Sequence, residues 1–394
     1  MQGMTPRERM LAAIRNEIPD RVPVAPDISN MIPCRLTGKP FWDIYYFNDP
    51  PLWKAYLAAV DHFGIDGWFT YGSMQFQFPG DRSEIVEDMQ KTAERWTVRS
   101  RLKIAGLTAH HSTAYYRADP PTALEKPIKD LKADWALVKA LFAPPTGYDP
   151  ALVQEQRKAL GEKGALGICT GCPGFHTYHW FIDGGLEAIA VAYYDERDLF
   201  LEMNALLEKR YVKEMEMILE VKPDFVLTGG SGAITMSSPK LVRELYLPTL
   251  KKQTAMARAA GVPTMVHCCG KEAVLVKWAA EETDLSCINP LEVPPMGDCN
   301  LAELKRRHGA KISLMGNLHT TALMLRGSAR DVRRASLQAI LDAGENGGFI
   351  LSTGDQCGRD TPDENIRAMV QAAEEFGRYP LDLAAIRDEI GRLT

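Results

Sequence analysis

Short apolar runs alternate with longer amphipathic stretches along most of the chain. The amphipathic stretches, such as SPKLVRELYLPTLKKQTAMARAAG and EAVLVKWAAEE, place apolar residues at helical spacing. Eight apolar runs are predicted strands: Arg21–Asp27, Asp66–Gly72, Ala165–Pro173, Asp224–Gly230, Pro263–Gly270, Leu285–Glu292, Lys311–Leu318 and Gly348–Asp355. Alternating strands and helices indicate βα units around a parallel sheet. The pattern therefore predicts an α/β fold, a (β/α)8 TIM barrel with an N-terminal helical extension.

The regular alternation is interrupted between about residues 73 and 143. The stretch KTAERWTVRSRLKIAGLTAHHS in this region has the pattern of a β-hairpin. We therefore predict one barrel domain over residues 1–394, with an insertion after the second strand that lies over the barrel mouth. An open doubly wound sheet is the alternative. No predicted strand is followed by G-x-G-x-x-G, which argues against a doubly wound fold that binds a nucleotide.

Composition and charge narrow the class of protein. A net charge of −5 without a Lys/Arg block gives no reason to expect a nucleic-acid partner. The start, MQGMTPRERMLAAIRNE, reads as a helix rather than a signal peptide, and no apolar run approaches membrane-spanning length. We therefore expect a cytoplasmic protein without a membrane partner. Eight cysteines in so long a chain are not a disulfide framework, so close cysteine clusters point to metal binding or catalysis.

The most informative cysteines lie in TMVHCCGKE, at the end of the fifth predicted strand. His267 and Cys269 are two positions apart, so both side chains face the same way and Cys268 faces the other. Cys357 lies just beyond the eighth strand, across the barrel mouth from the fifth. One nitrogen and two thiolates with an open fourth position are the ligand set of a catalytic zinc ion. The alternative is that these cysteines are small buried hydrophobes.

Other polar residues end the remaining strands. Asp27, Glu292, Asn317 and Asp355 occupy such positions, where a side chain either serves the active face of a barrel or caps the next helix. Glu292 is the strongest candidate for acid or base catalysis, because prolines follow it in NPLEVPP.

Two histidines lie in GFHTYHWF, after the third strand. His176 and His179 are candidates for contact with a substrate or a leaving oxygen, and packing beside aromatic residues is the alternative. The C-x-x-C of Cys169 and Cys172 has no second pair at zinc-ribbon spacing, so we interpret it as pocket lining.

Several stretches together resemble the uroporphyrinogen decarboxylase superfamily. They are MTPRERMLAAIRNEIPDRVPV, the HCCG strand, INPLEVPPMGDCNLAELKRRHG, ISLMGNLHT and FILSTGDQCGRDTPDENIRAMVQAAEEFGRYP. The chain departs from the true decarboxylases after the first strand, where APDISNMIPCRLTG replaces their RQAGRY-type segment. It also lacks an acidic residue in LTGGSGAITMSSP, after the fourth strand, where many members carry one. The branch it resembles is the corrinoid-dependent methyltransferases, similar to methyltransferase I of O-demethylases.

The resemblance implies the chemistry and the residues that carry it. In thiol-alkylating members of the branch, H-x-C and a later Cys hold zinc, which here implies His267, Cys269 and Cys357. Glu292, His176, His179 and Asp27 are then the catalytic candidates, and Asn317 and Asp355 are assigned to cofactor contacts.

The implied reaction transfers a methyl group from a small methylated substrate to cob(I)alamin. The sequence has no D-x-H-x-x-G corrinoid signature, so the cobalamin would arrive on a separate corrinoid protein. Relatives of this kind favour a methoxylated aromatic substrate and therefore O-demethylation, and aromatic residues such as Trp68 and Trp180 near the mouth suit an aryl ring. A zinc-dependent methylcobalamin:thiol methyltransferase is the first alternative. A decarboxylase-like or non-catalytic member is the alternative of another class. The resemblance also suggests a homodimer.

Overall fold

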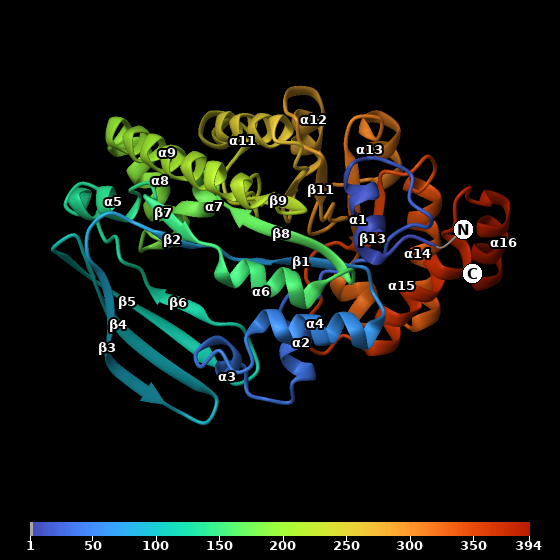
Figure 1. Cartoon of the computed structure of the whole chain (residues 1–394), viewed down its shortest axis with the longest axis horizontal. Helices are drawn as coiled ribbons and strands as arrows, with labels where there is room; N and C mark the ends of the chain where they lie inside the picture. Colours follow the sequence, from blue (N-terminus) through green and yellow to red (C-terminus); the bar gives the residue numbers. More distant parts are fainter. Residues whose placement is uncertain (1–2) are drawn as a thin grey trace.

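A curled sheet of seven parallel strands forms the centre of the molecule (Figure 1). The computed structural model describes residues 3–394. Residues 1 and 2 of the domain predicted over residues 1–394 lie outside the described part. In spatial order the strands are β1 (Gly67–Gly72), β8 (Gly164–Thr170), β9 (Phe225–Thr228), β10 (Thr264–His267), β11 (Cys287–Asn289), β12 (Ser313–Leu318) and β13 (Phe349–Thr353). Seven of the eight predicted strands are therefore confirmed, with shorter bounds.

An extended segment fills the eighth position of the barrel. Val24 pairs in parallel with Leu351 of β13, and the Ala25 amide donates to the Leu351 carbonyl at 2.9 Å. On the other side, the amide of Asp66 donates to the Val24 carbonyl at 2.9 Å, directly before β1. The Asp66 carboxylate in turn accepts the Val24 amide at 2.9 Å. These bonds close the sheet, so the predicted (β/α)8 barrel is confirmed, although its first strand is an irregular one.

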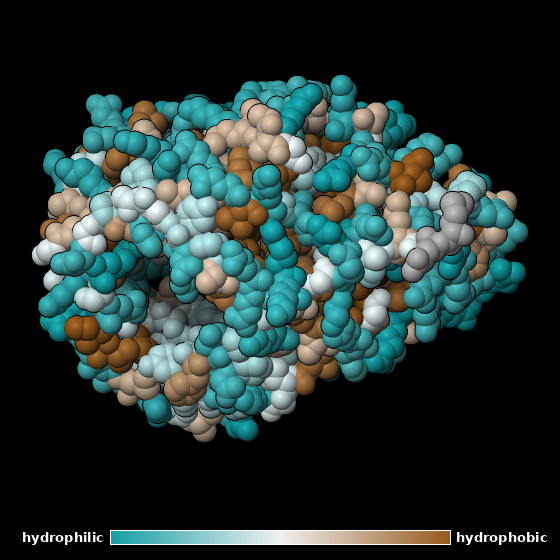
Figure 2. All heavy atoms as spheres, in the orientation of Figure 1, coloured by the Kyte–Doolittle hydropathy of each residue, from teal (hydrophilic) through white to brown (hydrophobic). Residues whose placement is uncertain are grey.

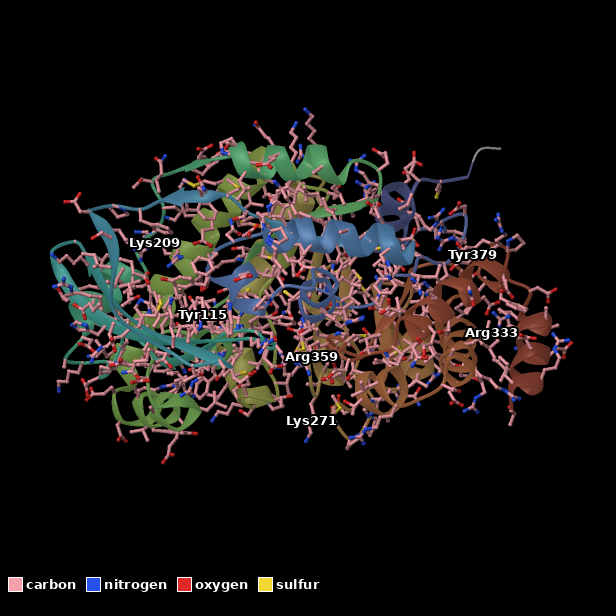
Figure 3. All side chains as sticks on the ribbon, turned by 90° about the horizontal axis from the view of Figure 1, so that it is seen from below. Tyr115, Lys209, Lys271, Arg333, Arg359 and Tyr379 are labelled. Carbon is pink, nitrogen blue, oxygen red and sulfur yellow. The ribbon has the colours of Figure 1, made fainter. Side chains whose placement is uncertain are left out.

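Helices cover the outside of the barrel, as the amphipathic stretches predicted. After β1 and β8 come α6 (Ala151–Leu160), α7 (Phe175–Tyr178), α8 (Gly185–Asp195) and α9 (Arg197–Val221). After β9 and β10 come α10 (Pro239–Leu241), η1 (Val242–Tyr246), α11 (Leu247–Ala259) and α12 (Ala273–Glu282). The last strands are followed by α13 (Leu301–His308), η2 (Thr320–Leu325), α14 (Ala329–Ala343), α15 (Asp363–Phe376) and α16 (Leu383–Leu393). Arg333 of α14 ties these last helices together through Glu375 of α15, at 2.6 Å, and Glu389 of α16, at 3.0 Å (Figure 3).

The predicted N-terminal extension is also helical. It is α1 (Pro6–Ile14), whereas α2 (Met31–Leu36), α3 (Phe41–Tyr45) and α4 (Leu52–Phe63) follow the irregular first strand and precede β1. Thr5 and Glu8 form a capping box at the start of α1, which satisfies two backbone amides that the helix leaves free. Met10, Ala13 and Ile14 of this helix join the core inside the barrel. Helix α1 therefore contributes to the inner core rather than to the outer layer.

Strand alternation divides the apolar residues of the barrel into two cores. Trp68, Phe225 and Met265 point inward and pack with one another, whereas Val226 and Val266, their neighbours in sequence, belong to the core between sheet and helices. The same period of two carries polar residues to the C-terminal end of the interior. The site described below lies directly above this apolar interior.

The insertion after β1 is an antiparallel sheet with additional short elements. Strands β3 (Arg82–Lys91), β4 (Arg95–Ile104), β5 (Leu107–Tyr116) and β6 (Thr122–Glu125) form it, and β2 (Gln75–Gln77), β7 (Gly147–Asp149) and α5 (Trp135–Leu141) flank it. The predicted hairpin is confirmed as β4 and β5. In Figure 1 the arrowheads of β1 and β8 point toward the insertion, which therefore lies on the C-terminal side of the barrel. Figure 2 shows the surface hollowed where the insertion borders the barrel.

One arginine links the insertion to the loop that follows β13. Arg359 donates to the Ala118 carbonyl at 2.7 Å and pairs with Asp360 at 2.8 Å (Figure 3). Tyr115 at the end of β5 packs edge-on against Tyr46, with ring centroids 5.1 Å apart, which anchors the sheet to the segment after α3. Among residues 3–394, no helix has the length and apolar character needed to cross a membrane.

Candidate metal centre

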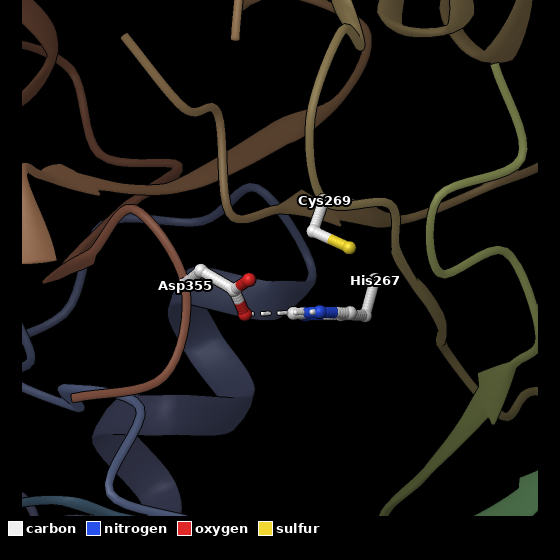
Figure 4. Close-up of side chains that lie close together, drawn as sticks. All are labelled: His267, Cys269 and Asp355. Atoms are coloured by element: carbon white, nitrogen blue, oxygen red, sulfur yellow. Dashed lines mark ion pairs between the residues drawn. The ribbon is translucent and has the colours of Figure 1, made fainter. Parts of the chain in front are cut away.

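Three side chains with metal-ligating atoms meet at the C-terminal end of the barrel. They are His267, Cys269 and Asp355, and their ligand atoms all lie within 4.8 Å of one another (Figure 4). The His267 Nε2 atom is 3.5 Å from Oδ1 of Asp355. A nitrogen, a sulfur and an oxygen donor in this proximity match the preferences of zinc, which takes three protein ligands and one exchangeable ligand in catalytic sites.

Strand β10 positions the first two donors. His267 ends the strand facing the barrel mouth, whereas Cys268 is fully buried in the core between sheet and helices, and its amide donates to the Asn289 carbonyl at 2.8 Å. The predicted division of the HCC run is therefore confirmed. The chain turns directly after Cys269, because Gly270 has φ +84° and a Cβ atom there would collide with Thr235.

The third donor lies in the loop after β13. Asp355 has φ +123°, a conformation that side-chain-bearing residues rarely adopt and that commonly marks functional sites. Its Oδ1 accepts the amide of Gln356 at 2.8 Å, and Gln356 in turn donates to Ser29 Oγ at 2.7 Å. The loop is thus held with the Asp355 carboxylate toward His267.

Two details of the cluster fit a bound cation. The Nδ1 atom of His267 is buried and has no hydrogen-bond partner in the described part of the chain. The Cys269 sulfur is 3.3 Å from Ser231 Oγ. Burial raises the pKa of the Cys269 thiol, so a cation nearby is what would keep it as a thiolate near neutral pH.

Cys357, the third predicted ligand, is not among the three clustered residues. It is fully buried, and its amide donates to the Asp27 carbonyl at 2.8 Å. Burial raises the pKa of its thiol to about 12, with a further contribution from the charge of Asp27. The structure therefore brings Asp355, the predicted cofactor contact, to the position beside His267 and Cys269.

Two cavities adjoin at the cluster. The larger, of about 830 Å³, is lined by His267, Asp27 and Trp68 among others, and the smaller, of about 450 Å³, by Cys269 and Glu292. Trp180, Ser231 and Asp355 line both. The three donors therefore stand on the boundary between two spaces, each of which can hold a molecule next to the same centre.

The predicted catalytic residues divide between these cavities. Asp27 lies in the larger one, and burial raises the pKa of its carboxyl group. Glu292, His176 and His179 line the smaller one. Burial raises the pKa of Glu292, whose carboxylate accepts the amide of Gly270, and burial lowers the pKa of His176 to about 3. A carboxyl group and a neutral imidazole therefore face the space beside Cys269.

Asn317 of β12, the other predicted cofactor contact, is buried and lines neither of the two cavities.

The two cysteines of the C-x-x-C differ in position. Cys169 lines the larger cavity as predicted, but Cys172 is fully buried and its thiol donates to the side-chain oxygen of Gln253 at 2.9 Å. Ser231, which touches Cys269 and lines both cavities, was not predicted as a site residue. The sequence feature that could have indicated it is the glycine-rich turn GGSG, which contains Ser231 and follows the fourth predicted strand.

Part of the chain is similar to a known protein family. Residues 192–376 match the family model described as Uroporphyrinogen decarboxylase (URO-D), from within α8 to the end of α15. This part of the chain, just under half of its length, is similar to the uroporphyrinogen decarboxylase family. The predicted superfamily is thereby confirmed, and the matched part contains all three clustered donors. No curated protein matched the sequence.

Solved structures resemble this chain in fold. A methyltransferase from Methanosarcina mazei superposes with a TM-score of 0.64 at 17% identity, over 95% of this chain and 99% of that one. The tandem GH20 modules of the pneumococcal N-acetylglucosaminidase StrH align with a TM-score of 0.35 at 14% identity, over 74% of this chain and 76% of that one. Only the first likeness is close enough to support an argument, and at this identity it shows a shared barrel fold.

Proposed function

We propose that this protein is a corrinoid-dependent methyltransferase that moves a methyl group from a small methoxylated aromatic to cob(I)alamin on a separate corrinoid protein. One observation carries the proposal: the donors His267, Cys269 and Asp355 stand between two cavities that meet at them. A transfer between two bound molecules needs such an arrangement. The family match and the methyltransferase name of the M. mazei structure support the same reaction class.

The proposed reaction balances as a nucleophilic displacement. The methyl carbon–oxygen bond breaks as a carbon–cobalt bond forms, cob(I)alamin supplies the electron pair, and the leaving aryl oxygen takes a proton. A zinc ion bound by His267, Cys269 and Asp355 would supply Lewis acidity toward that oxygen. Cys357 is the alternative to Asp355 as the third ligand.

The protein supplies position and a proton in this scheme. Glu292 lines the cavity beside Cys269, and burial raises its carboxyl pKa, so it holds a proton to higher pH than an exposed glutamate. Asp27 is the corresponding carboxyl group in the larger cavity, with its pKa also raised by burial. Either acid can protonate a leaving oxygen on its own side of the centre.

The proposal is tested by the absorption spectrum of cobalt. The purified chain, loaded with zinc, is mixed with a reduced corrinoid protein and a methoxyarene, and the conversion of cob(I)alamin to methylcobalamin is followed. We expect conversion with the wild type, loss of conversion with Cys269→Ala, and retention with Cys268→Ala, because Cys268 faces the outer core. No spectral change with any methyl ether or thiol would refute the methyltransferase.

A second candidate is a methylcobalamin:thiol methyltransferase, which the sulfur-containing donor set at Cys269 favours. In this reaction a thiolate attacks the methyl carbon of methylcobalamin: a carbon–sulfur bond forms, the carbon–cobalt bond breaks and its electron pair leaves with cob(I)alamin, while the thiol proton goes to solvent. The same assay run with methylcobalamin and thiols separates the two, since the thiol enzyme consumes methylcobalamin and leaves ethers untouched. A decarboxylase acting on a porphyrinogen with many carboxylates is disfavoured, because the residues lining the two cavities include no lysine or arginine.

A further inference from the structure

The two cavities at the barrel mouth contain acidic groups and no fixed cationic side chain. Asp27, Asp355 and Glu292 contribute carboxyl groups. Among the described residues that line them, none is a lysine or an arginine. Because burial holds the pKa values of His176 and His179 below the usual range, these side chains are neutral at neutral pH. His176 and His179 therefore contribute no positive charge to the smaller cavity.

The arginines nearest in sequence to the cavity walls are engaged elsewhere. Arg35 lies on α2, the helix whose Met31 lines the larger cavity, but it pairs with Asp363 at 2.6 Å. Arg359 follows Asp355 in the chain, but it bonds to Asp360 and to the Ala118 carbonyl. Neither guanidinium belongs to the cavity lining.

A bound dication does not change this balance by itself. The thiolate of Cys269 and the carboxylate of Asp355 would together neutralise its two positive charges. With the ether oxygen at the metal, the carboxylate of a para-substituted methoxybenzoate lies at the far end of the ring, where it would lose its hydration without gaining a counter-charge. Charged ligands of this kind are normally bound by arginine or lysine.

The rest of the larger cavity suits a flat, uncharged molecule. Trp68 and Trp180 provide aromatic surface, and Met31 and Leu227 provide aliphatic surface. Hydroxyl groups from threonine and serine residues, such as Thr70 and Ser231, provide neutral hydrogen-bonding positions. A cavity of about 830 Å³ is well within the range that accepts a substituted benzene.

We propose that the larger cavity selects uncharged methoxyarenes and rejects methoxybenzoates of the same shape. This inference rests on the proposed function only for the identity of the ether; the charge selection follows from the cavity lining. Discrimination of this kind comes from the missing counter-charge as much as from favourable contacts.

The test is calorimetric binding of a matched pair, 4-methoxybenzamide and 4-methoxybenzoate, to the zinc-loaded full chain at neutral pH. The two ligands have the same size, and only the second carries a charge. We expect the amide to bind at least about tenfold more tightly than the benzoate. Equal affinities, tighter binding of the benzoate, or no binding of either ligand would overturn the inference.

A gain-of-function variant tests the cause. Met31→Lys places a flexible ammonium group at the cavity wall, and we expect it to improve benzoate binding by about tenfold and to reverse or cancel the preference. Met31→Gln, similar in length and uncharged, should keep the wild-type order. If Met31→Lys is folded by circular dichroism and its preference is unchanged, the charge argument is wrong.

The binding and turnover measurements distinguish a failure of the charge selection from a failure of the proposed function. If the amide binds preferentially but the cobalt spectrum does not change with it, the proposed methyl transfer fails and the charge selection stands. If methyl transfer occurs and proceeds as well from the benzoate as from the amide, the proposed function stands and the charge selection fails.

Discussion

Nε2 of His267 lies 3.5 Å from Oδ1 of Asp355 and connects the ends of two strands that are not neighbours in the sheet. His267 ends β10, and Asp355 follows β13, with β11 and β12 between them in the sheet. The contact therefore crosses the barrel mouth, and Cys269 completes the cluster. A centre held by two distant strand ends depends on the closed barrel to keep its geometry.

The identity of the third ligand is decided by two substitutions. We expect Asp355→Asn to weaken zinc affinity by at least about tenfold, because it removes an anionic donor from the cluster. Cys357→Ser should change the affinity much less, since that thiol is buried outside the cluster. Zinc affinity is measured by competition with a chromophoric chelator. The opposite order, with Cys357→Ser the damaging change, would assign the ligand to Cys357.

Barrel closure depends on one buried carboxylate. Asp66 accepts the Val24 amide and pairs with Arg21 at 2.9 Å and with Arg9. Asp66→Ala leaves the buried Arg9 without one of its carboxylate partners, so we expect the free energy of unfolding to fall by about 3–5 kcal/mol. The exposed pair of Asp61 with Lys163 is a matched control, and Asp61→Ala should cost about 1 kcal/mol or less. Urea unfolding measures both, and equal losses would contradict the role of Asp66.

A buried acid beneath the site predicts a dependence of stability on pH. Burial raises the pKa of Glu272 well above its usual value, although its carboxylate accepts the Leu291 amide at 2.8 Å. Above the pKa of about 4.3 in the unfolded chain, the unfolded state loses this proton while the folded state keeps it. The folded state then binds more protons, so the free energy of unfolding decreases as pH rises, by up to about 1.4 kcal/mol per pH unit.

Glu272→Gln removes this titration. We therefore expect a shallower decline of stability than in the wild type between pH 5 and pH 7, measured by urea unfolding at both values. At about pH 3 and below, where the carboxyl group is almost fully protonated in both states, the difference between the two proteins should no longer vary with pH. A variant whose stability falls as steeply as that of the wild type would show that Glu272 is ionised in the fold.

Trp180, in the wall that the two cavities share, is predicted to contribute to substrate binding. Trp180 lines both cavities and is 63% exposed, so its ring is available to stack on an aryl group. We expect Trp180→Ala to raise the KM for a methoxyarene by about tenfold and to leave the melting temperature nearly unchanged. Tyr194→Ala is the control, because Tyr194 is 75% exposed and lines neither cavity. Similar KM values for the two variants would rule out a substrate contact by Trp180.

Strand periodicity was sufficient to predict much of this site. It gave seven of the barrel strands, the mouth-facing direction of His267, and the outward direction of Cys268. Such features follow from local alternation of side chains and need no knowledge of the rest of the fold. The irregular first strand was predicted too long, because its pairing depends on Asp66 and Leu351 rather than on its own sequence.

The loop after β13 shows where local reasoning ends. Cys357 and Asp355 are two residues apart, and periodicity cannot decide which one reaches His267 once the strand has ended. The positive φ of Asp355 and the hydrogen bond of the Cys357 amide to Asp27 set the direction of this loop. Both are tertiary effects, as is the contact between Ser231 and Cys269.

The metal content of the purified full chain tests the central claim most directly. After loading and gel filtration, we expect about one zinc ion per chain in the wild type and in Cys268→Ala, and a small fraction of that in Cys269→Ala. The adjacent cysteines face opposite sides of the chain directly after β10, and the buried Cys268 is the one more exposed to packing damage, so the pair separates ligation from general damage to the fold. A wild-type protein that retains no zinc, or a Cys269→Ala variant that retains as much as the wild type, would contradict the account.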